Sequence, residues 1–155
     1  MPAFRRKLVL CIVAVLTIAA VAFGVEMRPS HSGSDLIASN GSDSVVISAS
    51  SIAPGQARFF VYHGHSANDI RLIIARDDHG SVEATFDACE RCYMYRRGYE
   101  VAHGVMTCRW CGTHYKIASM NEGMSGCAPI KVPFRIKGDT IRIQTADLER
   151  QGKLF

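Results

Sequence analysis

Four cysteines in two Cys-x-x-Cys pairs oblige distant parts of this chain to meet. The pairs are Cys89 with Cys92 and Cys108 with Cys111, and 15 residues separate them. Two intervening residues let both thiolates of a pair face inward from one tight turn, while backbone N–H groups point at the sulfur atoms. Because a metal needs several soft donors at one point, the spacing predicts one four-cysteine centre between the two turns.

The cysteine spacing alone does not determine which metal binds at this centre, or whether the cysteines form disulfides instead. Structural zinc favours four tetrahedral thiolates. Iron also suits thiolates, either as a cluster or as a single ion. In an oxidising compartment the same residues could form disulfides or act as redox thiols. A fifth cysteine, Cys127, lies in a Gly/Pro loop; it is either a further ligand or a small buried residue.

The N-terminal quarter of the chain predicts a membrane anchor. Residues 8–25 form an 18-residue run without a charge, which is just long enough for a transmembrane helix. Basic residues within 1–7 predict a cytoplasmic N-terminus and an exported remainder. A cleaved signal peptide is the alternative. Residues 26–43 are rich in Ser, Gly and Asn and predict a flexible linker, and 44–155 remain as the exported, periplasmic domain.

Charge and motifs narrow the function classes. The net charge is +4, but three of the 18 basic residues precede the apolar run, so the exported part is nearly neutral. That composition gives no electrostatic argument for nucleic-acid binding. The chain shows no nucleophile elbow, phosphate loop or paired catalytic carboxylates. Hydrolytic and transferase chemistry is therefore not expected, and we predict no catalytic residues.

Short segments of β-branched and aromatic residues alternate with turn residues after the linker. This pattern predicts an all-β domain of antiparallel strands, as a two-sheet sandwich or a small barrel. His103-Gly104 predicts a two-residue hairpin turn, which would return the second cysteine pair to the first. The expected strands are 45–49, 58–62, 70–75, 82–86, 99–102, 105–107, 113–117, 134–137 and 140–144.

Two histidines offer a second, weaker metal motif. His63 and His65 are two residues apart, so on a strand both imidazoles would point to the same face. Imidazole binds copper and iron. The pair therefore predicts a second metal site, with a polar loop as the alternative because no third donor is identifiable.

The cysteine motifs resemble those of the FtrD-like membrane iron–sulfur family over residues 58–155. The matching elements are Phe86-Asp87-Ala88-Cys89-Glu90-x-Cys92-Tyr93, Gly98-Tyr99, Cys108-x-x-Cys111-Gly112, Gly126-Cys127-x-Pro129-Ile130, Asp147-Leu148 and Phe155. Ala128 departs from the Asn expected there. The resemblance implies a membrane-bound, ferredoxin-like component with an iron–sulfur cluster, [2Fe–2S] by expectation, in ferrous iron uptake at a bacterial inner membrane. It therefore implies an electron carrier rather than an enzyme. It also implies an inner-membrane iron permease and periplasmic iron- or copper-binding proteins as partners.

A weaker resemblance concerns the second cysteine pair and the strands after it. Residues 108–117 are similar to the second half of a Rieske domain, with Cys92 and Cys111 in the places of the two histidine ligands. This similarity implies a Rieske-like sandwich with the centre between two hairpin loops. The loop at 126–130 would then be a third loop that covers the site.

Overall fold

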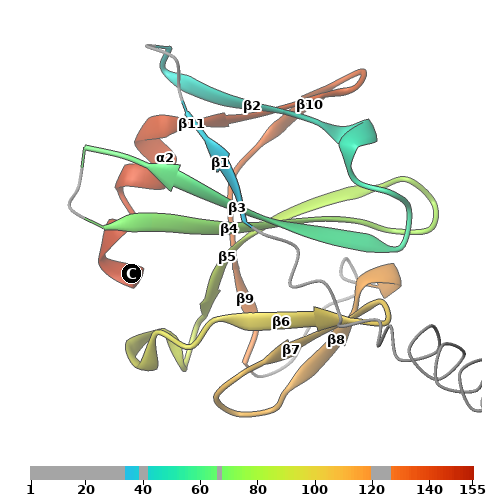
Figure 1. Cartoon of the computed structure of the whole chain (residues 1–155), viewed down its shortest axis with the longest axis vertical. Coiled ribbons are helices and arrows are strands. Elements are labelled where there is room, and N and C mark those ends of the chain that lie inside the picture. The colour runs from blue at the N-terminus through green and yellow to red at the C-terminus, as the bar shows by residue number, and fades with distance from the viewer. Residues whose placement is uncertain (1–33, 39–41, 66–67, 120–126) are drawn as a thin grey trace, which may run out of the picture. The chain divides into compact units, whose positions relative to one another are not determined.

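The computed structural model describes residues 34–38, 42–65, 68–119 and 127–155, all within one compact unit. These residues form an all-β domain of eleven strands, as the sequence predicts (Figure 1). The central sheet has the order β1 (Asp35–Ile37), β3 (Gln56–His63), β4 (Asp69–Arg76), β5 (Val82–Cys89) and β9 (Pro129–Lys131). A second sheet has the order β10 (Arg135–Lys137), β11 (Thr140–Gln144) and β2 (Ser44–Ser48). The third is β6 (Tyr99–Ala102), β7 (Val105–Cys108) and β8 (His114–Lys116).

The central sheet is buried on both faces. Along β4, Ile70, Leu72 and Ile74 join a core with the β10–β11–β2 sheet. Ile73 and Ala75 instead join a second core with the β6–β7–β8 sheet. Alternate residues of a strand point to opposite faces, so the unbroken apolar run of β4 fills two cores at once.

The expectation of two sheets is therefore wrong in number, although the all-β class is confirmed. The described residues form three sheets, with the largest between the other two (Figure 1). The physical reason lies in β4: a strand that is apolar on both faces needs a covering layer on each side.

Two short strands lie outside the predicted set. β1 falls inside the predicted flexible linker, 26–43, and pairs in parallel with β3, so this part of the segment belongs to the sheet. The Arg58 guanidinium forms an ion pair with the Asp35 carboxylate there. β9 follows Cys127 and extends the sheet beside β5.

The C-terminal segment closes the first core. α2 (Thr145–Glu149) and a 3-10 turn (Gly152–Leu154) follow β11, and Leu148, Leu154 and Phe155 pack into the core. The predicted segments 1–7 and 8–25 lie outside the described residues. Within the residues described, no helix has the length and apolarity needed to span a membrane.

Candidate metal centre

The first cysteine turn begins where β5 ends. Cys89 is the last residue of this strand and is buried, and its sulfur accepts hydrogen bonds from the backbone N–H groups of Arg91 and Cys92. Burial opposes ionisation of Cys89, but these N–H groups and the Cys127 thiol outweigh it and lower its pKa. The turn thus directs positive dipoles at a buried sulfur, as a thiolate ligand requires.

The second turn repeats this arrangement at the end of β7. The buried Cys108 sulfur accepts hydrogen bonds from the backbone N–H groups of Trp110 and Cys111. Burial, the largest influence, raises the pKa of the Cys108 thiol. Gly112 has a φ of +73° and donates its N–H to the Cys108 carbonyl at 3.0 Å, a backbone shape that glycine adopts without strain.

A hairpin and a buried carboxylate bring the two turns together. His103 and Gly104 both have positive φ, 51° and 71°, so the predicted two-residue turn is confirmed. The hairpin pairs Tyr99 of β6 with Cys108 of β7. The Asp87 carboxylate accepts the Tyr99 N–H at 2.6 Å. The start of the hairpin is thereby fixed to the strand that carries Cys89.

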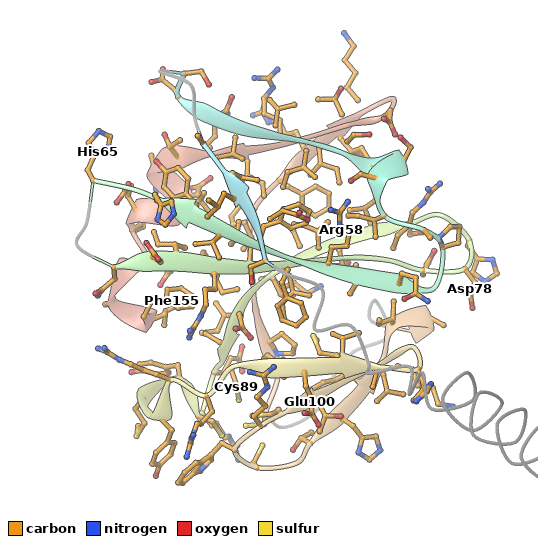
Figure 2. All side chains as sticks on the ribbon, viewed as in Figure 1. Arg58, His65, Asp78, Cys89, Glu100 and Phe155 are labelled. Carbon is orange, nitrogen blue, oxygen red and sulfur yellow. The ribbon has the colours of Figure 1, made fainter. Side chains whose placement is uncertain are left out.

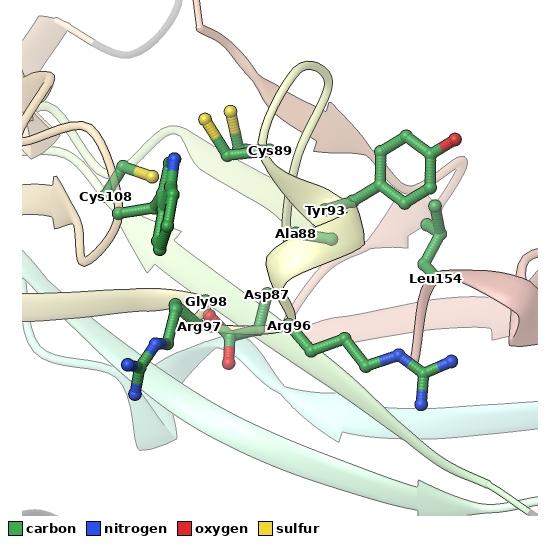
Figure 3. A pocket seen from close by; sticks show the side chains of 11 residues that line it. Asp87, Ala88, Cys89, Tyr93, Arg96, Arg97, Gly98, Cys108 and Leu154 are labelled. Carbon is green, nitrogen blue, oxygen red and sulfur yellow. The ribbon is translucent and has the colours of Figure 1, made fainter.

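The sulfur atoms converge in two groups that share one residue. In each group the sulfur atoms lie within 4.8 Å of one another; the groups are Cys89, Cys92 and Cys127, and Cys92, Cys108 and Cys111. Figure 3 shows the Cys89 and Cys108 side chains directed toward the same space. Burial and the neighbouring sulfurs raise the pKa of Cys92. The structure thus brings together all four cysteines of the predicted centre.

Cys127 joins them as a fifth thiol. Its sulfur lies 2.6 Å from that of Cys89 and 3.2 Å from that of Cys92. The Tyr115 hydroxyl donates a hydrogen bond to the Cys127 carbonyl, and Tyr99 does so at 3.4 Å. Burial and the hydrogen bond with Cys89 raise its pKa to about 11. Cys127 is therefore held at the site by its backbone as well as by its sulfur.

Cys111 is the exposed member of the five. The Thr113 hydroxyl, 3.3 Å from its sulfur, and the Thr113 N–H lower the pKa of Cys111 to about 6. Cys89, Cys108 and Cys127 are buried, whereas Cys111 is exposed. One edge of the sulfur cluster thus faces solvent.

The two histidines of the predicted second site lie beside different carboxylates. His63 Nδ1 lies 2.5 Å from an Asp69 carboxylate oxygen. His65, labelled in Figure 2, has its backbone N–H bonded to Glu149 at 2.8 Å and its ring 3.6 Å from the same carboxylate. Among the described residues, the clusters of metal-ligating donors consist of cysteines alone.

The sequence alone predicts no role at the site for Asp87, Tyr99 or Tyr115, although the first two belong to the motifs that resemble those of the FtrD-like family. A signal for Asp87 exists, because it is a carboxylate within a strand whose neighbours are apolar. Burial raises its pKa to about 6, against the hydrogen bond from Tyr99 and the nearby arginines. Arg71 Nε lies 3.5 Å from its other oxygen. The tyrosines carry no such signal, since their role depends on where the Cys127 loop returns.

A small cavity adjoins the thiols (Figure 3). Its volume is about 10 Å³, which is the space of roughly one water molecule. Cys89, Cys92 and Cys108 line it together with Asp87, Arg96 and Trp110. This cavity does not hold an organic substrate.

The donor set fits an inorganic centre. All the converging side chains are thiols, which are soft ligands that bind iron–sulfur clusters, zinc and copper(I). N–H groups directed at Cys89 and Cys108 stabilise negative sulfur. The residues therefore suit a cluster ligated by cysteines.

Comparison with known proteins agrees with this chemistry. No curated protein and no solved structure matched the chain. The family model described as membrane iron–sulfur containing protein FtrD-like matches residues 52–155, which include all five cysteines of the site. This chain belongs to the FtrD-like family of membrane iron–sulfur containing proteins.

Proposed function

We propose that this protein transfers electrons through an iron–sulfur cluster held by Cys89, Cys92, Cys108 and Cys111. The observation that carries the proposal is the repeated turn geometry, in which each first cysteine accepts two backbone N–H groups. Among the clusters that four cysteines can hold, we favour [2Fe–2S], because the two cysteine turns resemble those of a Rieske centre. Such a cluster, when bound, supplies one-electron oxidation and reduction.

The surrounding residues would tune this chemistry. The N–H groups at Cys89 and Cys108 stabilise negative charge on sulfur and so favour the reduced state. Buried Tyr99 and Tyr115 hold the Cys127 backbone over one side and exclude water there. The exposed Cys111 leaves an edge through which a partner could exchange electrons.

The arrangement also supports a Rieske-like placement of the cluster. Each cysteine turn follows a strand end, and the segment at Cys127 approaches both as a third element. We propose that Cys92 and Cys111 replace the two histidine ligands of a Rieske centre. Thiolates carry more negative charge than imidazoles and would lower the reduction potential.

The cellular setting that we propose comes from the family and from the N-terminal sequence. Residues 8–25 would anchor the protein in a bacterial inner membrane, with the β domain in the periplasm. There it would support uptake of ferrous iron beside an inner-membrane iron permease and periplasmic iron- or copper-binding proteins.

A second candidate is thiol–disulfide exchange. The Cys89 and Cys127 sulfurs lie 2.6 Å apart, closer than non-bonded sulfur atoms normally approach, which favours this candidate. Oxidation of these two thiols would form one S–S bond and release two electrons and two protons to a disulfide oxidant. A third candidate is a docking subunit stabilised by zinc, which would bind the cysteines of the two Cys-x-x-Cys turns without redox chemistry.

Iron, sulfide and zinc content per chain, with the visible spectrum of anaerobically purified protein, distinguishes these functions. An iron–sulfur protein is brown and bleaches with dithionite. Zinc in place of iron gives a colourless protein, and a dithiol protein contains neither metal. Either of these last two results would overturn the electron-transfer proposal.

A further inference from the structure

Exposed apolar side chains gather at the cysteine turns. Of the seven large apolar side chains that the described part of the chain exposes, four lie on these two turns. Their exposed fractions run from 38% to 64%; they are Tyr93, Met94, Tyr95 and Trp110. The other three are scattered over β1, β2 and β10. A local concentration of this kind marks an interaction surface.

Two of these side chains join the turns into one flat face. The Tyr95 and Trp110 rings stack with centroids 3.7 Å apart and planes 12° apart, although they come from different turns. Tyr93 and Trp110 also line the small cavity that reaches Cys89, Cys92 and Cys108. The exposed aromatic rings therefore lie directly beside the thiols.

The charged residues around these rings are mainly arginines. Arg91, Arg96, Arg97 and Arg109 are exposed, and the structure places no carboxylate within ion-pair distance of them among the residues it describes. Figure 3 shows Arg96 and Arg97 extending away from the sulfur atoms. Glu90 is the acidic residue exposed on the same two turns. The rim of this face is thus strongly basic.

We infer that the aromatic–arginine face, formed by these four apolar residues and four arginines, docks an acidic redox protein. Aromatic residues, Met and Arg are enriched at protein interfaces. Guanidinium groups that form no ion pair within the described residues suit a rim of carboxylates on the partner, whose charge would steer association. The role rests on the proposed function: one electron would pass between the redox group of the partner and a cluster held by the cysteines, and no covalent bond would form or break.

An anionic membrane surface is the rival occupant, since Trp, Tyr and Arg also favour lipid interfaces. The position of the face decides between them. It adjoins the thiols, and a lipid surface neither donates nor accepts electrons. The closeness of this face to the thiols therefore favours a redox protein over a membrane as the binding partner.

Binding calorimetry of the purified full chain, in its natural metal state, tests the docking face against an acidic flavodoxin. We expect binding at about 20 mM salt that weakens strongly at about 500 mM. Arg96→Glu with Arg97→Glu should weaken binding about tenfold at low salt. The matched control is Arg135→Glu with Lys137→Glu, an equal charge change on exposed β10, which should leave binding unchanged.

Several outcomes of these binding experiments would contradict the inferred docking face. Equal flavodoxin affinity in both charge variants, or equally tight binding of basic cytochrome c, would overturn the inference. Trp110 is the only tryptophan of the chain, so its fluorescence reports on this face directly. A blue shift with phosphatidylglycerol vesicles, without flavodoxin binding, would assign the face to lipid. Calorimetry needs no cluster, so a zinc protein that still binds flavodoxin would contradict only the electron-transfer proposal.

Discussion

The Asp87 carboxylate accepts the backbone N–H of Tyr99 at 2.6 Å and so joins the two cysteine turns. Asp87 lies two residues before Cys89, and Tyr99 is paired with Cys108 in the hairpin. Gly98, with a φ of +64°, lets the chain pass this carboxylate closely. A Cβ atom at Gly98 would lie 2.4 Å from the Asp87 oxygens.

Gly98→Ala should therefore destabilise the domain by about 3 kcal/mol, through steric conflict added to backbone strain. Gly138→Ala is the matched control, because Gly138 has a φ of +58° with nothing within 4 Å of its Cβ position. Backbone strain alone should cost this control about 1 kcal/mol. Denaturant unfolding measures both, and equal losses would show that the Asp87 contact has no energetic weight.

Cys108→Ser should remove the metal and with it much of the stability, because ligand loss couples metal release to unfolding. Cys127→Ser should retain iron, since the four cysteines of the two Cys-x-x-Cys turns remain. Metal content and thermal unfolding of both variants measure the difference. If Cys127→Ser loses iron as completely as Cys108→Ser, Cys127 is a ligand and the four-cysteine assignment is wrong.

The reduction potential of the proposed cluster should lie below about −150 mV, toward the plant-ferredoxin end of the range, because all four proposed ligands are thiolates. The potential should also lack the steep pH dependence that ligand imidazoles confer. Protein-film voltammetry between pH 6 and 9 measures both quantities. A value well above zero would contradict thiolate-only ligation.

Tyr115→Phe should loosen the backbone at Cys127. Once this hydroxyl is lost, the Cys127 carbonyl keeps, among the described residues, the longer hydrogen bond from Tyr99 at 3.4 Å. We expect a loss of about 1 kcal/mol in unfolding free energy and faster alkylation of Cys127 by iodoacetamide in metal-free protein. Tyr95→Phe, at an exposed ring, serves as the control. Unchanged alkylation in Tyr115→Phe would argue against this positioning role.

Asp139 should make stability sensitive to acid. Hydrogen bonds from the Ser48 and Ser50 hydroxyls and the Ser50 N–H lower its pKa below the ordinary 3.8. Because the folded-state pKa is depressed, the stabilisation is present above the unfolded pKa and disappears as pH falls through the folded value. Asp139→Asn should thus lower the melting temperature at pH 7 but not at pH 2.

The exposed Glu100 on β6 provides the comparison for this acid effect. Glu100→Gln should shift the melting temperature little at either pH. A constant difference between wild type and Asp139→Asn from pH 7 to pH 2 would rule out ionisation of Asp139 as the cause.

The parts of the site that sequence reasoning predicts are those determined locally. The Cys-x-x-Cys spacing encodes the N–H groups at Cys89 and Cys108, and His103-Gly104 encodes the hairpin that returns one turn to the other. The sequence does not determine the role of Cys127, because its position depends on contacts with Tyr99 and Tyr115, which come from the β6–β7–β8 sheet.

The fold, like the site, is predictable from sequence where local residues determine it and not where distant contacts do. Nine strands have a recognisable run of apolar and β-branched residues, and each was expected near its observed position. β1 and β9 have only three residues each, too few for a periodic signal. The third sheet is not predictable in this way, because a short continuous apolar run such as that in β4 does not by itself distinguish a strand covered on both faces from a buried helical segment.

Neighbouring residues of β5 serve different halves of the domain. Ala88 packs into the core beside the β10–β11–β2 sheet, whereas Cys89 packs into the core beside the hairpin. Loss of the metal should therefore destabilise the core beside the β6–β7–β8 sheet more than the core beside the β10–β11–β2 sheet. We expect the metal-free protein to unfold in two transitions. The β6–β7–β8 sheet should unfold first, while the other core stays folded until a higher temperature.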